Sequence, residues 1–300
     1  ISLGLVGSEM CIRDRQMNGG VLSDDLASAG VCELMANALT LGSQQRSIEA
    51  MAARLDEMGA HLSASSGKQS VSVNASCLSD DCLEVLQLMA EVVNEPLWDE
   101  DALRRELASM KAAVAEAMED PFEVANTRLM DSLFASQGYA LPVGGTLESL
   151  AQVTPEHAKQ RHSALFHAAN AVLVVVGSVD AQILQQQINR CFAPMPMGQV
   201  WNLPASQQVL GETIELSMDK HQAIVTIACA GVTYFDPRRY ALMLLMEYVS
   251  DMAGPLFVRI REELGLAYQV SAYALYGHDV GAVVFYLSTS PEQMQQASDE

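Results

Sequence analysis

The sequence predicts an α+β fold of two repeated units, each a mainly antiparallel or mixed sheet with helices packed on it, the second unit truncated. Three observations predict it. Half of the 300 residues are hydrophobic and only 18% are charged, which is ample for packed cores. Helical and alternating apolar patterns occur together along the chain. Finally, the order helix, helix, glycine stop, hairpin, helix occurs twice.

The first unit opens with two helices and a hairpin. Apolar residues at helical spacing predict a helix over Leu26–Thr40, and Ser47 can cap a second helix over Ile48–Met58. Strict alternation of apolar and polar residues over 71–77 predicts a strand with one buried face. The preceding run, His61–Ser65, is its expected partner across a glycine turn.

Helices alternate with one strand through the rest of this unit. A continuous β-branched run over Asn170–Gly177 predicts a central strand, buried on both faces. The Pro- and Gly-containing stretch from Ala193 to about Ser206 predicts a linker. Helices are expected over Asp80–Val93, Asp99–Glu119, Phe122–Phe134, Pro155–His167 and Ala181–Phe192.

The second unit follows the same order. Its helix stop even matches locally, because Glu262-Glu263-Leu264-Gly265 parallels Asp56-Glu57-Met58-Gly59. Strands are expected over Glu212–Met218 and Gln222–Ala230, helices over Tyr240–Ser250 and Gly254–Leu264, a hairpin over Tyr268–Tyr276 and Val280–Ser288, and a final helix from Ser290. The apolar run Tyr240–Val249 is expected to be a core segment.

The repeat divides the chain into three parts. Residues 1–16 resemble one reading frame through a sequencing-library adapter, and are expected to be an artefact or a short disordered tail. Residues 17–199 form the first unit, whose N-terminal strands are expected to be missing. Residues 200–300 form the second unit, whose C-terminal part is expected to be missing.

Composition and motifs exclude several functions. With 37 acidic against 17 basic residues the net charge is −20, which argues against nucleic acid or an anionic membrane as partner. No apolar run approaches the roughly 18 residues of a membrane helix.

The sequence lacks the glycine patterns of dinucleotide-binding, P-loop and nucleophile-elbow proteins. No two histidines are four apart, so a helical zinc pair is not encoded. The six cysteines show no C-x-x-C and are expected to be buried small hydrophobes.

Several segments are similar, in order, to segments of the insulinase/pitrilysin-type metallopeptidases, to which the processing-peptidase subunits are related. Those enzymes carry the inverted zinc motif H-x-x-E-H. The most specific match is Phe257-x-x-Ile-Arg-Glu-Glu-Leu-Gly-Leu-Ala-Tyr268. The others are Asn37–Ser47, Leu55–Ala64, Asn94–Trp98, Gly145–Leu150 and Asn170–Asp180.

The resemblance implies that this chain lacks the metal site. Alignment on Gly42 places Glu33 at the first zinc histidine, Ala36 at the general-base glutamate and Asn37 at the second histidine, and none matches. No metal or cofactor is therefore expected in this chain. The family's distal zinc-binding glutamate would fall on the helix that holds Glu106, Glu116 and Glu119.

The second unit keeps an Arg and a Tyr seven residues apart, Arg261 and Tyr268, as the family does. The resemblance implies that they reach into the active site of a partner half, and hydrogen-bond the substrate carbonyl and the oxyanion formed during hydrolysis. The spacing is physically sensible. Arg261 falls in the last helical turn, Gly265 allows a left-handed stop, and Tyr268 opens the strand.

The implied function is that of a non-catalytic half of a zinc endopeptidase or oligopeptidase, inactive alone. It would form the wall of a peptide chamber and serve a zinc-bearing half, either upstream in the same polypeptide or a separate subunit, in hydrolysis by zinc-bound water. The alternative is a structural or binding subunit of the same fold with no peptidase activity, as the core subunits of the respiratory bc1 complex resemble this family. The compartment is left open between bacterial periplasm, slightly favoured, and cytoplasm.

Overall fold

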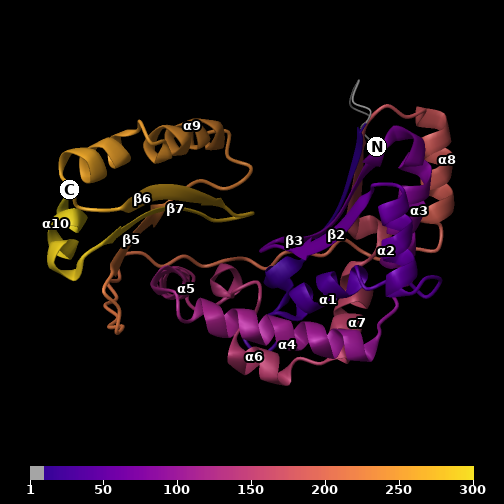
Figure 1. Cartoon of the computed structure of the whole chain (residues 1–300), viewed down its shortest axis with the longest axis horizontal. Coiled ribbons are helices and arrows are strands. Elements are labelled where there is room, and N and C mark those ends of the chain that lie inside the picture. The colour runs from indigo at the N-terminus through magenta and orange to yellow at the C-terminus, as the bar shows by residue number, and fades with distance from the viewer. Residues whose placement is uncertain (1–9) are drawn as a thin grey trace. The chain divides into compact units, whose positions relative to one another are not determined.

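The computed structural model describes residues 10–300, which divide into two compact units (Figure 1). Among the described residues, unit 1 contains residues 10–112 together with residues 142–203. Unit 2 contains residues 113–141 and 204–300. Each unit combines helices with an antiparallel sheet, so the predicted α+β class is confirmed.

The sheet of unit 1 has four strands in the order β2-β3-β1-β4, and every neighbouring pair is antiparallel. Along β3 the residues alternate between buried and half-buried, which confirms the predicted one-sided strand. The strands are β1 (Met10–Asn18), β2 (His61–Ser66), β3 (Ser70–Leu78) and β4 (Ala171–Val176).

Two expectations about this sheet are wrong. Residues 10–16 belong to β1, between β3 and β4, rather than to a tail, because backbone pairing with two neighbours needs no distinctive side-chain pattern; residues 1–9 lie outside the described part. β4 is an edge strand and not a central one, since it pairs with β1 alone among the described residues. Its apolar run has only one covered face: Val175 is buried, whereas Val172 and Val174 are exposed.

Helices of unit 1 cover one face of the sheet (Figure 1). Leu86 of α3 and Leu184 of α8 pack with Val175 of β4 in one buried cluster. The first helix begins at Val31 rather than Leu26, because Gly30 precedes it with φ 95°, which a helix cannot include. The helices are α1 (Val31–Leu39), α2 (Ile48–Glu57), α3 (Cys82–Asn94), α4 (Glu100–Ala117), α6 (Leu147–Gln152), α7 (Pro155–Leu165) and α8 (Ala181–Cys191), with short 3₁₀ turns at Gly20–Ser23, Ser79–Asp81 and Ala168–Asn170.

Unit 2 repeats this plan in part. Its strand order β6-β7-β5 matches β2-β3-β1 of unit 1, and in both units a helix follows the first strand, which supports the predicted repeat. Its elements are α5 (Pro121–Leu133), a 3₁₀ turn at Gly138–Ala140, β5 (Ala223–Ala230), α9 (Arg239–Ser250), a π-helix (Phe257–Glu263), β6 (Gln269–Tyr276), β7 (Gly281–Thr289), a 3₁₀ turn at Pro291–Gln293 and α10 (Met294–Asp299).

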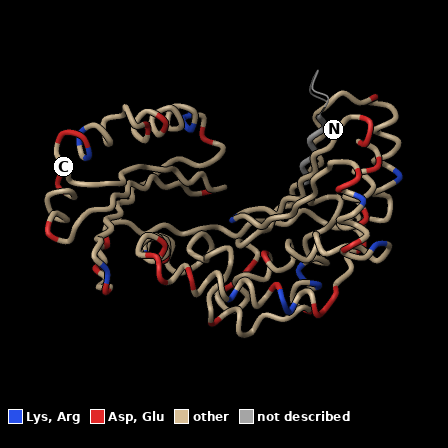
Figure 2. Tube along the Cα trace, in the orientation of Figure 1, with Lys and Arg blue, Asp and Glu red and all other residues tan. Residues whose placement is uncertain are grey.

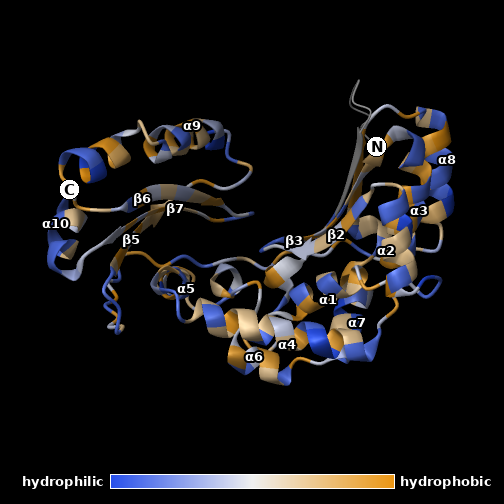
Figure 3. Ribbon diagram, viewed as in Figure 1, coloured by the Kyte–Doolittle hydropathy of each residue, from blue (hydrophilic) through white to orange (hydrophobic). Residues whose placement is uncertain are grey.

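Two expectations about unit 2 are also wrong. Residues 212–218 form no strand, and their apolar side chains Ile214 and Leu216 are about half exposed, so no buried face holds them in a sheet. The apolar run 240–249 forms a helix but not a core segment. Met246 of α9 is buried against the sheet, whereas Leu244 is 73% exposed. Hydrophobic and hydrophilic residues both occur along α9 (Figure 3).

Charges are spread along the helices of both units, with Lys and Arg interspersed among more numerous Asp and Glu (Figure 2). None of the helices in the described range is long and apolar enough to cross a bilayer. Cys32, Cys77 and Cys82 are buried, as expected for small hydrophobes, but Cys229 is exposed.

Candidate functional site

Helix α1 presents Glu33 and Asn37 on one face, one helical turn apart. The Asn37 side-chain amide, Nδ2, donates a hydrogen bond of 2.8 Å to Oε1 of Glu106 on α4. Glu33 accepts a hydrogen bond of 3.2 Å from the backbone N–H of Ser66 at the end of β2. Ala36, between them, is fully buried and offers no polar group. The structure thus brings together two of the aligned motif positions and one of the three candidate distal glutamates.

The carboxylates of Glu33 and Glu106 are close enough to influence each other. Burial raises the pKa of Glu33 above its ordinary value, and the nearby Glu106 carboxylate raises it further, while the Ser66 N–H opposes both. Within the described residues, no set of three or more His, Cys, Asp or Glu side chains could hold a metal ion. The donor set therefore does not fit zinc, which prefers nitrogen and sulfur ligands in tetrahedral array.

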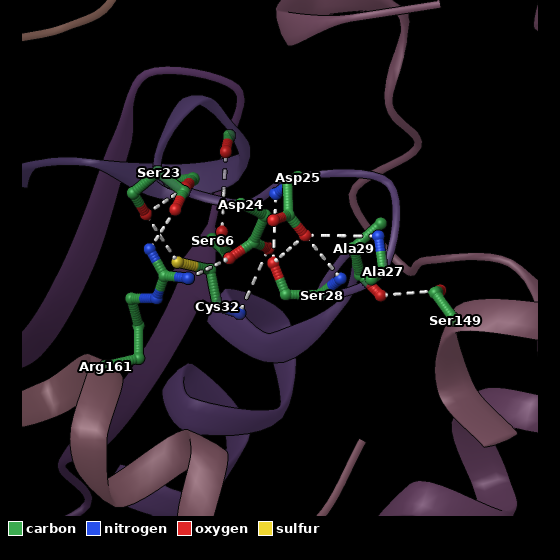
Figure 4. Close-up of polar contacts among 12 residues, drawn as sticks. Ser23, Asp24, Asp25, Ala27, Ser28, Ala29, Cys32, Ser66, Ser149 and Arg161 are labelled. Carbon is green, nitrogen blue, oxygen red and sulfur yellow. Dashed lines mark hydrogen bonds and ion pairs between the residues drawn. The ribbon is translucent and has the colours of Figure 1, made fainter. Parts of the chain in front are cut away.

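A second polar cluster lies around the residues that precede α1 and its first turn (Figure 4). The buried carboxylate of Asp24 lies 3.1 Å from Nη2 of Arg161 on α7, and its other oxygen accepts from the Cys32 N–H at 3.4 Å. Arg161 also donates to the Ser23 carbonyl, and the Ser23 hydroxyl lies 3.1 Å from the Cys32 sulfur. These contacts tie the start of α1 to α7. No sequence signal could have found them, because Asp24 and Arg161 are far apart in the chain.

Arg261 and Tyr268 lie together in unit 2. Arg261 Nη1 donates to the Tyr268 carbonyl over 3.0 Å, and its guanidinium stands 4.8 Å from the centre of the Tyr268 ring. The same guanidinium is 4.7 Å from the Phe257 ring, so it stacks between two aromatic rings. Phe257 begins the most specific matched segment, but no role is predicted for it from the sequence, although its i,i+4 spacing to Arg261 is a usable signal.

The local backbone explains this convergence. Arg261 lies in a π-helix where a regular α-helix was expected, with the Leu264 N–H bonded to the Arg259 carbonyl five residues earlier. Gly265 then takes φ +62°, the expected left-handed stop, and Tyr268 comes directly before β6. The Tyr268 side chain is 79% exposed. A phenol and a guanidinium so placed can both donate hydrogen bonds to a ligand.

Comparisons with known proteins match both units. The profile described as insulinase (peptidase family M16) matches residues 16–147, and the profile described as peptidase M16 inactive domain matches residues 152–300. The chain belongs to peptidase family M16. The predicted family is thereby confirmed. The profile named as inactive covers α7, β4 and α8 of unit 1 as well as the part of unit 2 that follows residue 203.

Individual relatives are distant. An uncharacterized zinc protease of Rickettsia felis is 25% identical over 89% of this chain and 65% of its own length. A protein of Helicobacter pylori named a non-peptidase homolog is 23% identical over 84% of this chain and 59% of its own length. A solved peptidase M16 inactive domain from Pseudomonas fluorescens superposes with TM-score 0.91 at 23% identity, covering 97% of this chain and 72% of that one. This M16 chain thus spans about two thirds of the first relative.

Proposed function

We propose that this M16 chain is a non-catalytic half of a zinc endopeptidase or oligopeptidase, with residues 17–199 and 200–300 as its two peptidase-like units. It forms part of a peptide chamber and presents Arg261 and Tyr268 to a zinc-bearing half. The chain is inactive by itself because its aligned motif positions hold Glu33, Ala36 and Asn37, which supply neither a zinc ligand set nor a general base.

The observation that carries the proposal is the geometry of the Arg261–Tyr268 pair. The two side chains are in contact, yet Tyr268 is largely exposed and the Arg261 side chain is about one-third exposed. One Nη1–H of Arg261 bonds the Tyr268 carbonyl, and Nε lies 3.7 Å from a carboxylate oxygen of Glu262. The Nη2 donors are left for a substrate oxygen. Stacking between Phe257 and Tyr268 holds the fork in one orientation, as a preorganised donor requires.

In this proposal the pair binds the carbonyl oxygen of the scissile peptide, and stabilises the negative charge that develops on it. Donors fixed before the reaction stabilise that charge more than they stabilise the ground state, so they raise kcat rather than affinity. The metal and the general base belong to the zinc-bearing half, upstream in the same polypeptide or in another subunit.

The test is Arg261→Ala in the assembly that contains a zinc-bearing half. We expect kcat for a peptide substrate to fall by about 10²–10³ with little change in KM, the usual effect of losing one oxyanion donor. Arg259→Ala, two residues earlier on the same π-helix, is the matched control, because Arg259 pairs with Glu263 and Glu300. A turnover of Arg261→Ala equal to that of Arg259→Ala would refute the assigned role.

A structural or binding subunit without peptidase activity is the second candidate. One observation favours it: a relative from Helicobacter pylori is named a non-peptidase homolog. The two candidates differ in the gene that encodes the partner half. A partner with H-x-x-E-H and a downstream glutamate supports the peptidase, whereas a complete gene and complex without that motif supports the structural subunit.

A further inference from the structure

The outer edge of β6 is bonded by side chains instead of a neighbouring strand. β6 pairs with β7 alone among the described residues, so the backbone groups of every second residue point away from β7. Ala272 is one of these residues, and both of its outward groups bond Ser250 at the end of α9. The Ser250 hydroxyl donates to the Ala272 carbonyl over 2.7 Å and accepts from the Ala272 N–H over 3.2 Å.

The same edge is bonded a second time at the residue directly before β6. Tyr268 gives its N–H to the carbonyl of Ser288 in β7, and its own carbonyl accepts from Arg261 over 3.0 Å. Between the two bonded positions, the side chain of Val270 lies in a buried cluster. A strand added at this edge would have to pair with the groups that Ser250 and Arg261 already bond.

We infer that Ser250, together with Arg261, closes the edge of β6 against strand addition, so that unit 2 pairs there with neither a second copy of this chain nor an extended peptide. Unprotected sheet edges associate readily, and proteins cover or interrupt them. One hydroxyl is sufficient at Ala272 because it both donates and accepts, as the backbone of an incoming strand would. For the substrate the inference rests on the proposed function: the peptide meets the side chains of Arg261 and Tyr268, and does not extend the sheet.

The first test is amide hydrogen exchange, resolved by residue with NMR. In the unsubstituted chain the Ala272 amide should exchange about tenfold slower than that of Ala274, which points to the same edge and bonds no side chain of the described residues. Ser250→Ala should remove this difference, and Ser250→Thr, which keeps the hydroxyl, should preserve it. Equal exchange of the two amides in the unsubstituted chain would overturn the inference, whether or not a variant folds.

The second test measures self-association by analytical ultracentrifugation over a range of protein concentrations. Ser250→Ala should lower the dissociation constant of the dimer about tenfold relative to the unsubstituted chain, and the dimer should protect the Ala272 amide. Ser250→Thr is the matched control and should associate as the unsubstituted chain does. Urea unfolding identifies a merely structural role, because a Ser250→Ala variant that is less stable but associates no more strongly would overturn the inference. Neither test uses an assembly with a zinc-bearing half, so the inference and the proposed function can fail separately.

Discussion

One side chain, Asp24, makes the stability of unit 1 depend on pH. Burial raises the pKa of its carboxyl to about 6, and the attraction of Arg161 only partly opposes this. The folded state therefore holds the proton more tightly than the unfolded state does. The contribution of Asp24 to stability is full below its unfolded value of 3.8, declines as pH rises, and is lost above about 6.

Asp24→Asn should remove this pH dependence. Relative to the variant, the unsubstituted chain should lose about 2 kcal/mol of unfolding free energy between pH 4 and pH 7. Urea unfolding of both proteins across that range measures it. Asp25→Asn is the matched control, because a hydrogen bond from Ser28 lowers the pKa of Asp25 and gives the opposite slope. Parallel stability curves for Asp24→Asn and the unsubstituted chain would contradict the account.

Helices α1 and α9 hold the same place in the two units but differ in burial. Leu34 of α1 is completely buried, whereas Leu244 of α9 is 73% exposed. Leu34→Ala should therefore lower the free energy of unfolding by about 2–5 kcal/mol, through lost burial and a cavity. Leu244→Ala should change it by no more than about 0.5 kcal/mol. Thermal and urea unfolding measure both, and equal costs would mean that α9 is covered in solution.

The glycines that end corresponding helices in the two units provide a test of the predicted repeat. Gly59 in unit 1 and Gly265 in unit 2 take φ +56° and +62°, and an added Cβ would meet nothing within 4 Å at either. Gly59→Ala and Gly265→Ala should each cost about 1 kcal/mol, from backbone strain alone. Urea unfolding of each variant checks this. A neutral or stabilising substitution would show that the residue is not left-handed.

The elements predicted correctly are those whose signal is local. Ser47 caps α2 as its type and position indicate, accepting from the Ala50 N–H, and the alternation of β3 gives its buried face. The errors come from non-local packing. The apolar run of β4 predicts a central strand, because the local sequence does not show that β4 pairs with only one strand among the described residues. The apolar run of α9 predicts a core helix, although one face of a helix cannot bury all of its apolar residues.

The candidate site divides in the same way. The pairing of Arg261 with Tyr268 follows from spacing and a glycine stop, but the π-helix and the stacked Phe257 do not show in the pattern. That Glu106, and not Glu116 or Glu119, meets Asn37 depends on where two helices cross. The Asp24–Arg161 pair depends on the docking of α7.

At the scale of the whole molecule, the two units share the order of their strands and helices but carry different polar clusters. Unit 1 has a metal-free cluster where catalytic relatives of family M16 are expected to hold zinc, and unit 2 carries an exposed phenol beside a guanidinium. In the proposed function this chain catalyses no reaction by itself. The effect of its residues is therefore measured as the turnover of an assembly that includes the zinc-bearing half.

The most direct test of that contribution is kcat for Tyr268→Phe in an assembly with the zinc-bearing half, beside Tyr248→Phe on the exposed face of α9. Both substitutions remove one exposed hydroxyl. Tyr268→Phe should lower kcat by about 10²–10³ with KM nearly unchanged, and Tyr248→Phe should leave both constants as they were. Equal kcat values for the two variants would contradict this expectation.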